Sequence, residues 1–219
     1  RTFLTILGVL VGIASMTIIF ALSGGLGQMI VDQVDDQGGA IVVIRPKEPG
    51  INNKNIISSL ATSKAFTKSS ITEQDVTNAS KAKDVLAASP IAVFSSDLKS
   101  ANETITGNIL ATSPDLEKIV NLKLADGQFI TNTSGANNTV IGHQMAVDLF
   151  GTSQAIGQNI YIKGQPFLVV GVLEKQKNSI NFSNVDFDNV AIINFSAGKI
   201  LNQDTIQIQQ INVKVNSIN

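Results

Sequence analysis

Few residues of this sequence could carry out chemistry. His143 is the only histidine and cysteine is absent, which excludes thiolate zinc sites, disulfides and cysteine nucleophiles. Asp186 and Asp188 lie close together, but their spacing supplies fewer oxygen ligands than a calcium site needs. Ser153 and Ser183 have no histidine in a triad-like arrangement. We therefore expect no catalytic, cofactor or metal site, and we expect His143 to be a surface or capping residue at a helix start.

Two further classes of function are disfavoured by motif and charge. No G-x-x-x-x-G-K-[ST] phosphate loop occurs in the 219 residues, so we predict that the chain is not an ATPase. The formal net charge of −1 provides no field that would attract a phosphate backbone, so nucleic acid is not an expected partner.

The first segment is strongly apolar. After Arg1 no charged residue occurs before Asp32, and the apolar run from Phe3 to Leu22 has the roughly 20 residues that span a bilayer. We predict a transmembrane helix over residues 1–23. A secretory signal peptide, with Ala21-Leu22-Ser23 as its cleavage site, is the alternative.

Two features of this segment suggest how it sits in the membrane. Gly8 and Gly12 form a small-xxx-small pair, which lets a second helix approach closely in lipid, and ordinary glycine content is the alternative explanation. Arg1 before the run and the acidic cluster from Asp32 to Asp36 after it place the amino terminus in the cytoplasm.

A stalk is expected beyond the membrane, over residues 24–39. Leu26, Ile30 and Val34 recur at four-residue steps with polar residues between them, as in an amphipathic helix, and Gly38-Gly39 terminates the pattern. The glycines before and after Leu26 weaken a helix, so a hinge at the membrane surface is the alternative to a continuous stalk.

From Ala40 onward the composition is that of a soluble domain of the α+β class. Strands alternate with short helices, and Lys163-Gly164 is placed to form a hairpin turn. Pro90 predicts a bulge or an edge position in its strand. Strands are expected at 40–44, 85–94, 103–111, 139–141, 159–162, 167–173, 190–193 and 206–215, with helices at 73–83, after 113–115, and at 143–150.

Two stretches resemble one family. RTFLTILGVLVGIASMTIIFA, residues 1–21, is similar to the first membrane helix of MacB-like (MacB/FtsX-like) ABC transporter permeases. VIGHQMAVDLFGTSQAIGQNIYIKGQPFLVVGVLEK, residues 140–175, resembles a helix, a Leu-Phe-Gly stop and a hairpin of the same family. Together they cover about a quarter of the chain, and their order and separation make the resemblance more specific than either stretch alone.

The resemblance implies a permease of the cell (inner) membrane whose main domain is extracytoplasmic. It implies a two-lobed domain: a porter-like lobe formed by residues 40–112 and 190–219, and an inserted smaller lobe formed by residues 113–189. Such a domain handles substrate and couples to ATP hydrolysis by mechanotransmission. The implied partners are an ABC ATPase domain or subunit, a second or paired permease, the membrane and, where the system has one, a periplasmic adaptor.

A permease chain returns to the membrane after this domain, so the strands at 40–44 and 206–215 are expected to be neighbours in one sheet. The alternative functions are a single-pass anchored sensor or adhesion domain and, third, a secreted hydrolase with a retained signal peptide. Three further membrane helices after Asn219 would favour the permease, and a kinase or cell-wall segment would favour the sensor.

Overall fold

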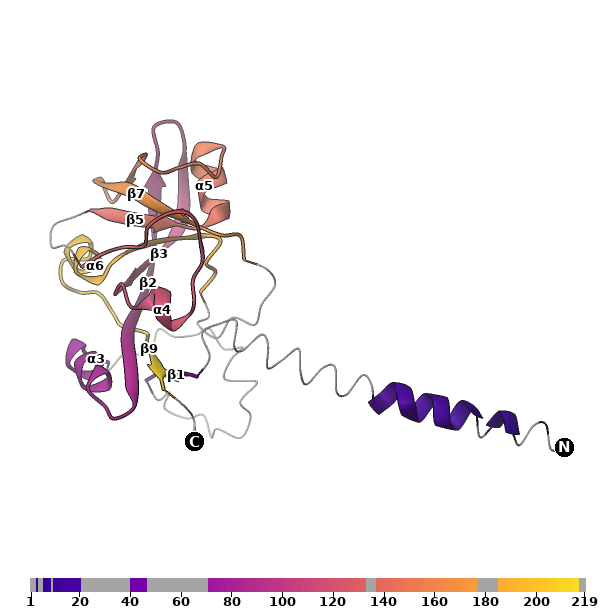
Figure 1. Ribbon diagram of the computed structural model, residues 1–219. Helices are drawn as coiled ribbons and strands as arrows, with labels where there is room; N and C mark the ends of the chain where they lie inside the picture. The colour runs from indigo at the N-terminus through magenta and orange to yellow at the C-terminus, as the bar shows by residue number, and fades with distance from the viewer. Residues whose placement is uncertain are drawn as a thin grey trace.

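The computed structural model describes residues 3, 6–8, 10–20, 40–46, 71–132, 137–176 and 185–216. Beyond the helical residues 10–20, the described part is a mixed sheet with short helices packed against it (Figure 1). The helices are α3 (Glu73–Ser80), α4 (Leu116–Ile119), α5 (His143–Phe150) and α6 (Phe195–Leu201). The strands are β1 (Ile41–Ile44), β2 (Val85–Lys99), β3 (Thr104–Thr112), β4 (Leu124–Gly127), β5 (Asn138–Ile141), β6 (Asn159–Ile162), β7 (Gln165–Leu173), β8 (Val190–Asn194) and β9 (Gln210–Val215).

The strand order is β1-β9-β2-β3-β8-β5-β7-β4, and β6 pairs with both β2 and β7. The pairs β3·β8 and β5·β7 are parallel, and the other described pairs are antiparallel. This arrangement confirms the predicted mixture of helix and sheet.

The expected pairing of the first and last strands is confirmed. β1 and β9 are antiparallel neighbours, with Ile41 opposite Lys214 and Ile44 opposite Ile211. The Val215 amide also donates to the Ala40 carbonyl at 3.1 Å. Residues from near the two ends of the chain therefore lie side by side.

β2 is longer than the sequence predicts, because it belongs to two ladders in succession. Residues up to Ile91 pair with β9, and residues from Ala92 pair with β3. Pro90 stands in register opposite Ile211, and the irregularity in this ladder lies between Val85 and Ala87. The β3 ladder begins after Pro90, so that ladder needs no amide hydrogen from the proline.

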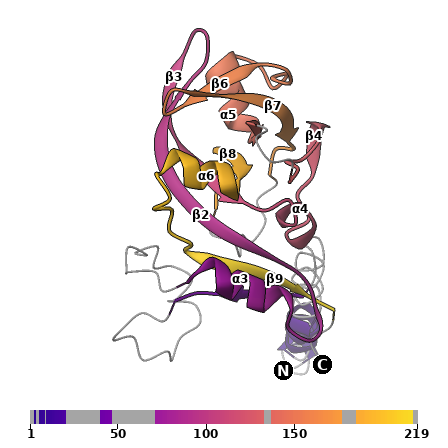
Figure 2. The same ribbon diagram turned by 90° about the vertical axis from the view of Figure 1, so that its left-hand side faces the viewer.

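The central strands are buried on both faces of the sheet. In β3, Ile109 and Ala111 join one apolar cluster with α5 and α6 residues, whereas Leu110 joins a second cluster with Leu116 of α4. This alternation follows from the two-residue period of a strand, and Figure 2 shows the helices distributed around the sheet. A third, smaller cluster packs α3 against β9 and the first half of β2.

Helix α6 is absent from the sequence-based expectation, and β9 begins four residues later than the predicted 206. Gly198 within α6 lowers helix propensity and conceals the pattern. In the fold this glycine allows close contact, since a Cβ there would lie 2.4 Å from the Ala111 Cβ of β3. The residues Asp126-Gly127, a pair typical of turns, instead end strand β4 opposite Val172 and Gly171.

Candidate functional surfaces

The polar residues that could do chemistry have structural roles in the described part of the chain. His143 is the first residue of α5 and is half-buried. Asp186 accepts from the Asp188 amide and from the Asn189 side chain, and Asp188 accepts from the Gln176 amide at 2.9 Å. Among the described residues no group of three or more His, Cys, Asp or Glu could hold a metal ion.

The membrane-helix residues are only partly described. Gly8 and residues 10–20, Gly12 included, are helical, and every described side chain from Phe3 to Phe20 is exposed. A Cβ added at Gly8 or at Gly12 would meet no atom within 4 Å. Within the described residues no helix is long and apolar enough to cross a membrane. The transmembrane helix over 1–23 and the packing role of the two glycines therefore stay predictions.

The predicted stalk residues Leu26, Ile30 and Val34 lie outside the described residues.

A three-stranded unit, which we name the end sheet, contains the first and the last strand of the described sheet. It consists of β1, β9 and residues Val85–Ile91 of β2. Figure 1 shows β1 and β9 at the opposite end of the domain from the turn between β2 and β3.

Helix α3 covers one face of the end sheet and begins with a side-chain cap at Thr72. The Thr72 side chain accepts from the Asp75 amide, and the Asp75 carboxylate accepts from the Thr72 amide at 2.8 Å. The backbone hydrogen bond from Thr72, followed by the bond from its hydroxyl, lowers the pKa of Asp75. This capping box fixes the start of the helix.

An ion pair links α3 to α6. Lys199 Nζ donates to Glu73 Oε1 at 2.6 Å, and this hydrogen bond raises the pKa of Lys199. Both side chains are solvent-exposed to a substantial degree, so the pair orients the two helices and contributes little to stability.

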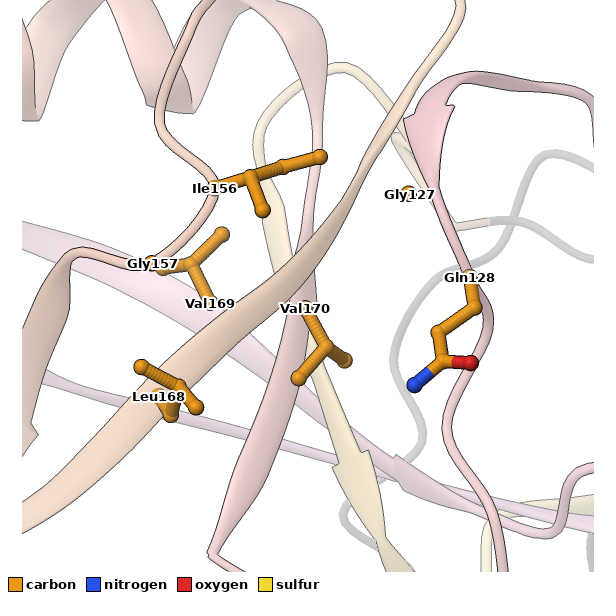
Figure 3. A pocket seen from close by; sticks show the side chains of 7 residues that line it. All are labelled: Gly127, Gln128, Ile156, Gly157, Leu168, Val169 and Val170. Carbon is orange, nitrogen blue, oxygen red and sulfur yellow. The ribbon is translucent and has the colours of Figure 1, made fainter.

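A shallow hollow of about 350 Å³ lies on the outer side of β7, where its neighbour changes from β6 to β4 (Figure 3). Ile156 and Leu168 are each 41% exposed beside it, which is high for large apolar side chains. Sequence reasoning missed this surface, although Ile156-Gly157 is part of the family-like stretch. The lining residues are Gly127, Gln128, Ile156, Gly157, Leu168, Val169 and Val170.

A model of the MacB-like periplasmic core domain family matches residues 2–218, nearly the whole chain. The chain belongs to this family. The resemblance seen in residues 1–21 and 140–175 is thereby confirmed.

Named relatives of this MacB-like domain are exporters. The macrolide export ATP-binding/permease protein MacB of Wolinella succinogenes is 28% identical over 203 residues, covering 91% of this chain and 30% of that protein. The pyoverdine export ATP-binding/permease protein PvdT of Pseudomonas aeruginosa is 26% identical over 209 residues, covering 91% of this chain and 28% of that protein. The chain thus spans about a third of the length of these relatives.

Solved structures support the MacB-like fold. The periplasmic region of MacB from Actinobacillus actinomycetemcomitans superposes with a TM-score of 0.65 at 17% identity, covering 87% of this chain and 82% of that one. The extracellular domain of the noncanonic ABC-type transporter YknZ from Gram-positive bacteria gives 0.59 at 18% identity, covering 81% and 84%. At these identities the likeness concerns the fold.

Proposed function

We propose that this chain is the extracytoplasmic coupling and substrate-handling domain of an ABC export permease in the cell (inner) membrane. The observation that carries the proposal is the pairing of β1 with β9 in a chain that belongs to the MacB-like family. A domain inserted between two membrane helices must return its chain to the side from which it left, and adjacent first and last strands meet that requirement.

In this proposal the chain hydrolyses no ATP itself. The relatives named above are ATP-binding/permease proteins of which this chain matches about a third, so the motor belongs to another domain or subunit. Closure of that motor is transmitted through the stalk of residues 24–39 to the end sheet, and from there to the substrate outside the membrane. The family membership favours this function over the anchored sensor or adhesion domain.

The proposed assembly contains two permease copies or a paired permease, with Gly8 and Gly12 packing against another helix in lipid. A periplasmic adaptor is the further partner where the system has one. Within the domain, we retain the porter-like lobe of residues 40–112 and 190–219 and the inserted lobe of residues 113–189 as the proposed division.

The test of coupling uses the full-length permease with its ATPase. Ile30→Pro breaks the hydrogen-bond ladder of a helical stalk, at a local cost of about 3 kcal/mol. We expect export to fail while ATP hydrolysis persists, and we expect the matched control Ile30→Leu to leave both intact. Normal export by Ile30→Pro would refute coupling through a continuous stalk.

A further inference from the structure

Strand β2 joins the end sheet to the rest of the strands, which we name the main sheet. Its residues up to Ile91 pair with β9, and those from Ala92 onward pair with β3. The chain crosses between the two sheets a second time in residues 202–209, between α6 and β9. In the described part of the chain these are the two covalent crossings.

On the β9 side of β2, a side chain takes the place of the backbone ladder just beyond Ile91. The Gln209 amide nitrogen of the main chain donates to the Ile91 carbonyl at 2.9 Å. The Gln209 side chain then pairs with both backbone groups of Val93: its Oε1 accepts from the amide at 2.6 Å, and its Nε2 donates to the carbonyl at 2.8 Å. Gln209 belongs to the second crossing, residues 202–209. Its hydrogen bonds to Ile91 and Val93 therefore tie the second crossing to the first, which is β2.

On the β3 side, hydroxyl groups take the place of the ladder just before it begins at Ala92, beside Ser89 and Pro90. Thr112 Oγ1 donates to the Pro90 carbonyl at 2.8 Å and lies 2.8 Å from Ser89 Oγ. Because the Thr112 hydroxyl has one hydrogen, Ser89 is the donor in the second contact. Ser113 Oγ donates to Ser89 Oγ at 2.8 Å, and the Ser113 amide lies 3.3 Å from the same oxygen.

The boundary between the sheets combines polar and apolar side chains, because the buried Ile91 and Ala92 of β2 belong to apolar clusters and lie next to these hydroxyl groups. Four of the six buried polar side chains in the described part lie on the strands that meet here: Ser89, Thr112, Gln210 and Asn212. Separating such a boundary lets water replace the lost hydrogen bonds, whereas opening an apolar cluster exposes hydrocarbon with no compensation. The polar contacts at the boundary therefore cost less to open than the same number of apolar contacts.

We propose that residues 89–93 of β2 form a hinge between the end sheet and the main sheet, and that the Gln209 side chain holds this hinge closed. Pro90 lies within this hinge. The side chains of Thr112 and Gln209 bond to the backbone of β2 here, at Pro90 and Val93. The role of the hinge in transport rests on the proposed function, but its existence does not, because it follows from contacts within this chain.

The test compares Gln209→Leu with the unchanged chain and with Gln144→Leu. Gln144 is the matched control because its side chain donates to Asp148 on the exposed face of α5, away from the hinge. Nitroxide labels replace the exposed residues Lys83, in the turn before β2, and Glu103, in the turn after it. We expect Gln209→Leu to broaden or shift the distance distribution between the labels, and Gln144→Leu to leave it unchanged.

Amide hydrogen exchange distinguishes opening of the hinge from the loss of only the Gln209 hydrogen bonds. The Ser113 amide contacts Ser89 and not Gln209, so its exchange changes only if the two sides of β2 open together. We expect Gln209→Leu to accelerate exchange at Ser113 by about thirtyfold, as the loss of two hydrogen bonds implies. The Gly142 amide, which donates to Val190 within the main sheet, reports on global unfolding and should stay protected.

A second variant keeps the test decisive if Gln209→Leu does not fold. Gln209→Glu retains the acceptor for the Val93 amide and loses the donor to its carbonyl, so we expect a smaller broadening in the same direction. Unchanged label distances and unchanged Ser113 exchange in the folded variants would refute the hinge. Neither measurement uses ATP or substrate, so failure here would leave the export function to its own test.

Discussion

Gly142 lies where the start of α5 contacts the turn before β8, and replacing it tests how tightly the two pack. It is the N-cap residue of α5 and has extended backbone angles, φ −67° and ψ 156°. Alanine adopts these angles without strain, so the effect of Gly142→Ala comes from contact alone. A Cβ at this position would lie 2.2 Å from the Asp188 carbonyl oxygen and 2.3 Å from that of Phe187. Both obstacles are backbone, so the helix start or the turn must move by about 1 Å, since carbon and oxygen need more than about 3 Å.

Such a movement disrupts two hydrogen bonds. The Gly142 amide donates to the Val190 carbonyl at 2.9 Å, and the Met145 amide donates to the Asp188 carbonyl at 3.1 Å. Each contributes about 1 kcal/mol net, and overpacking at the low end of its usual range adds about 1 kcal/mol, because the added group is a single methyl. We therefore expect Gly142→Ala to lower the free energy of unfolding by about 3 kcal/mol.

Thermal unfolding of the purified chain, followed by far-ultraviolet circular dichroism, measures this effect. A loss of about 3 kcal/mol lowers Tm by about 6–12 °C in a domain of this size. Gln144→Ala on the exposed face of the same helix is the control, with an expected change within about 0.5 kcal/mol. Equal Tm values for the two variants would show that the turn yields without cost and would refute the packing argument.

The remaining predictions concern nucleotide binding and the cap of α3. The purified chain should bind no ATP, because it has no phosphate loop; saturable binding at about micromolar nucleotide, measured by calorimetry, would contradict a separate motor. Thr72→Ala should lower the free energy of unfolding, measured in urea, by about 1 kcal/mol. A change smaller than the error of that measurement would show that the capping box does not stabilise the domain. Folding lowers the pKa of Asp75, so the ionised carboxylate stabilises the folded domain. This stabilisation is fully present above the unfolded pKa of about 3.9 and is lost as the pH falls through the lower folded pKa. Asp75→Asn should accordingly reduce stability at pH 7 and reduce it less as the pH falls below the unfolded pKa, and a pH-independent difference would disprove the assignment.

Local signals in the sequence predicted much of the fold. The helix His143–Phe150 has its predicted bounds because apolar periodicity, a starting glycine and the left-handed Gly151 all agree. The hairpin of β6 and β7 turns at Lys163-Gly164, where both residues have positive φ as that turn requires. These elements depend on residues close together in sequence.

The features that sequence reasoning missed depend on distant contacts. Helix α6 is stabilised by the close approach of Gly198 to Ala111, which no local pattern reports. The pairing of the Gln209 side chain with Val93 joins residues 116 positions apart. The hollow beside Ile156 forms because β4 and β6 meet the same edge of β7, which the sequence of β7 alone does not indicate.

The central claim is that this domain transmits nucleotide-driven motion away from the membrane. The turn between β2 and β3 lies at the opposite end of the domain from the end sheet, which makes it the sensitive place to look (Figure 1). Nitroxide labels at Glu103 in both copies of the full-length transporter, in lipid nanodiscs, give the distance between the two turns by double electron–electron resonance. We predict that trapping the ATPase with vanadate shifts this distance relative to the nucleotide-free state. Identical distance distributions in the two states, in a transporter that still hydrolyses ATP, would contradict the account.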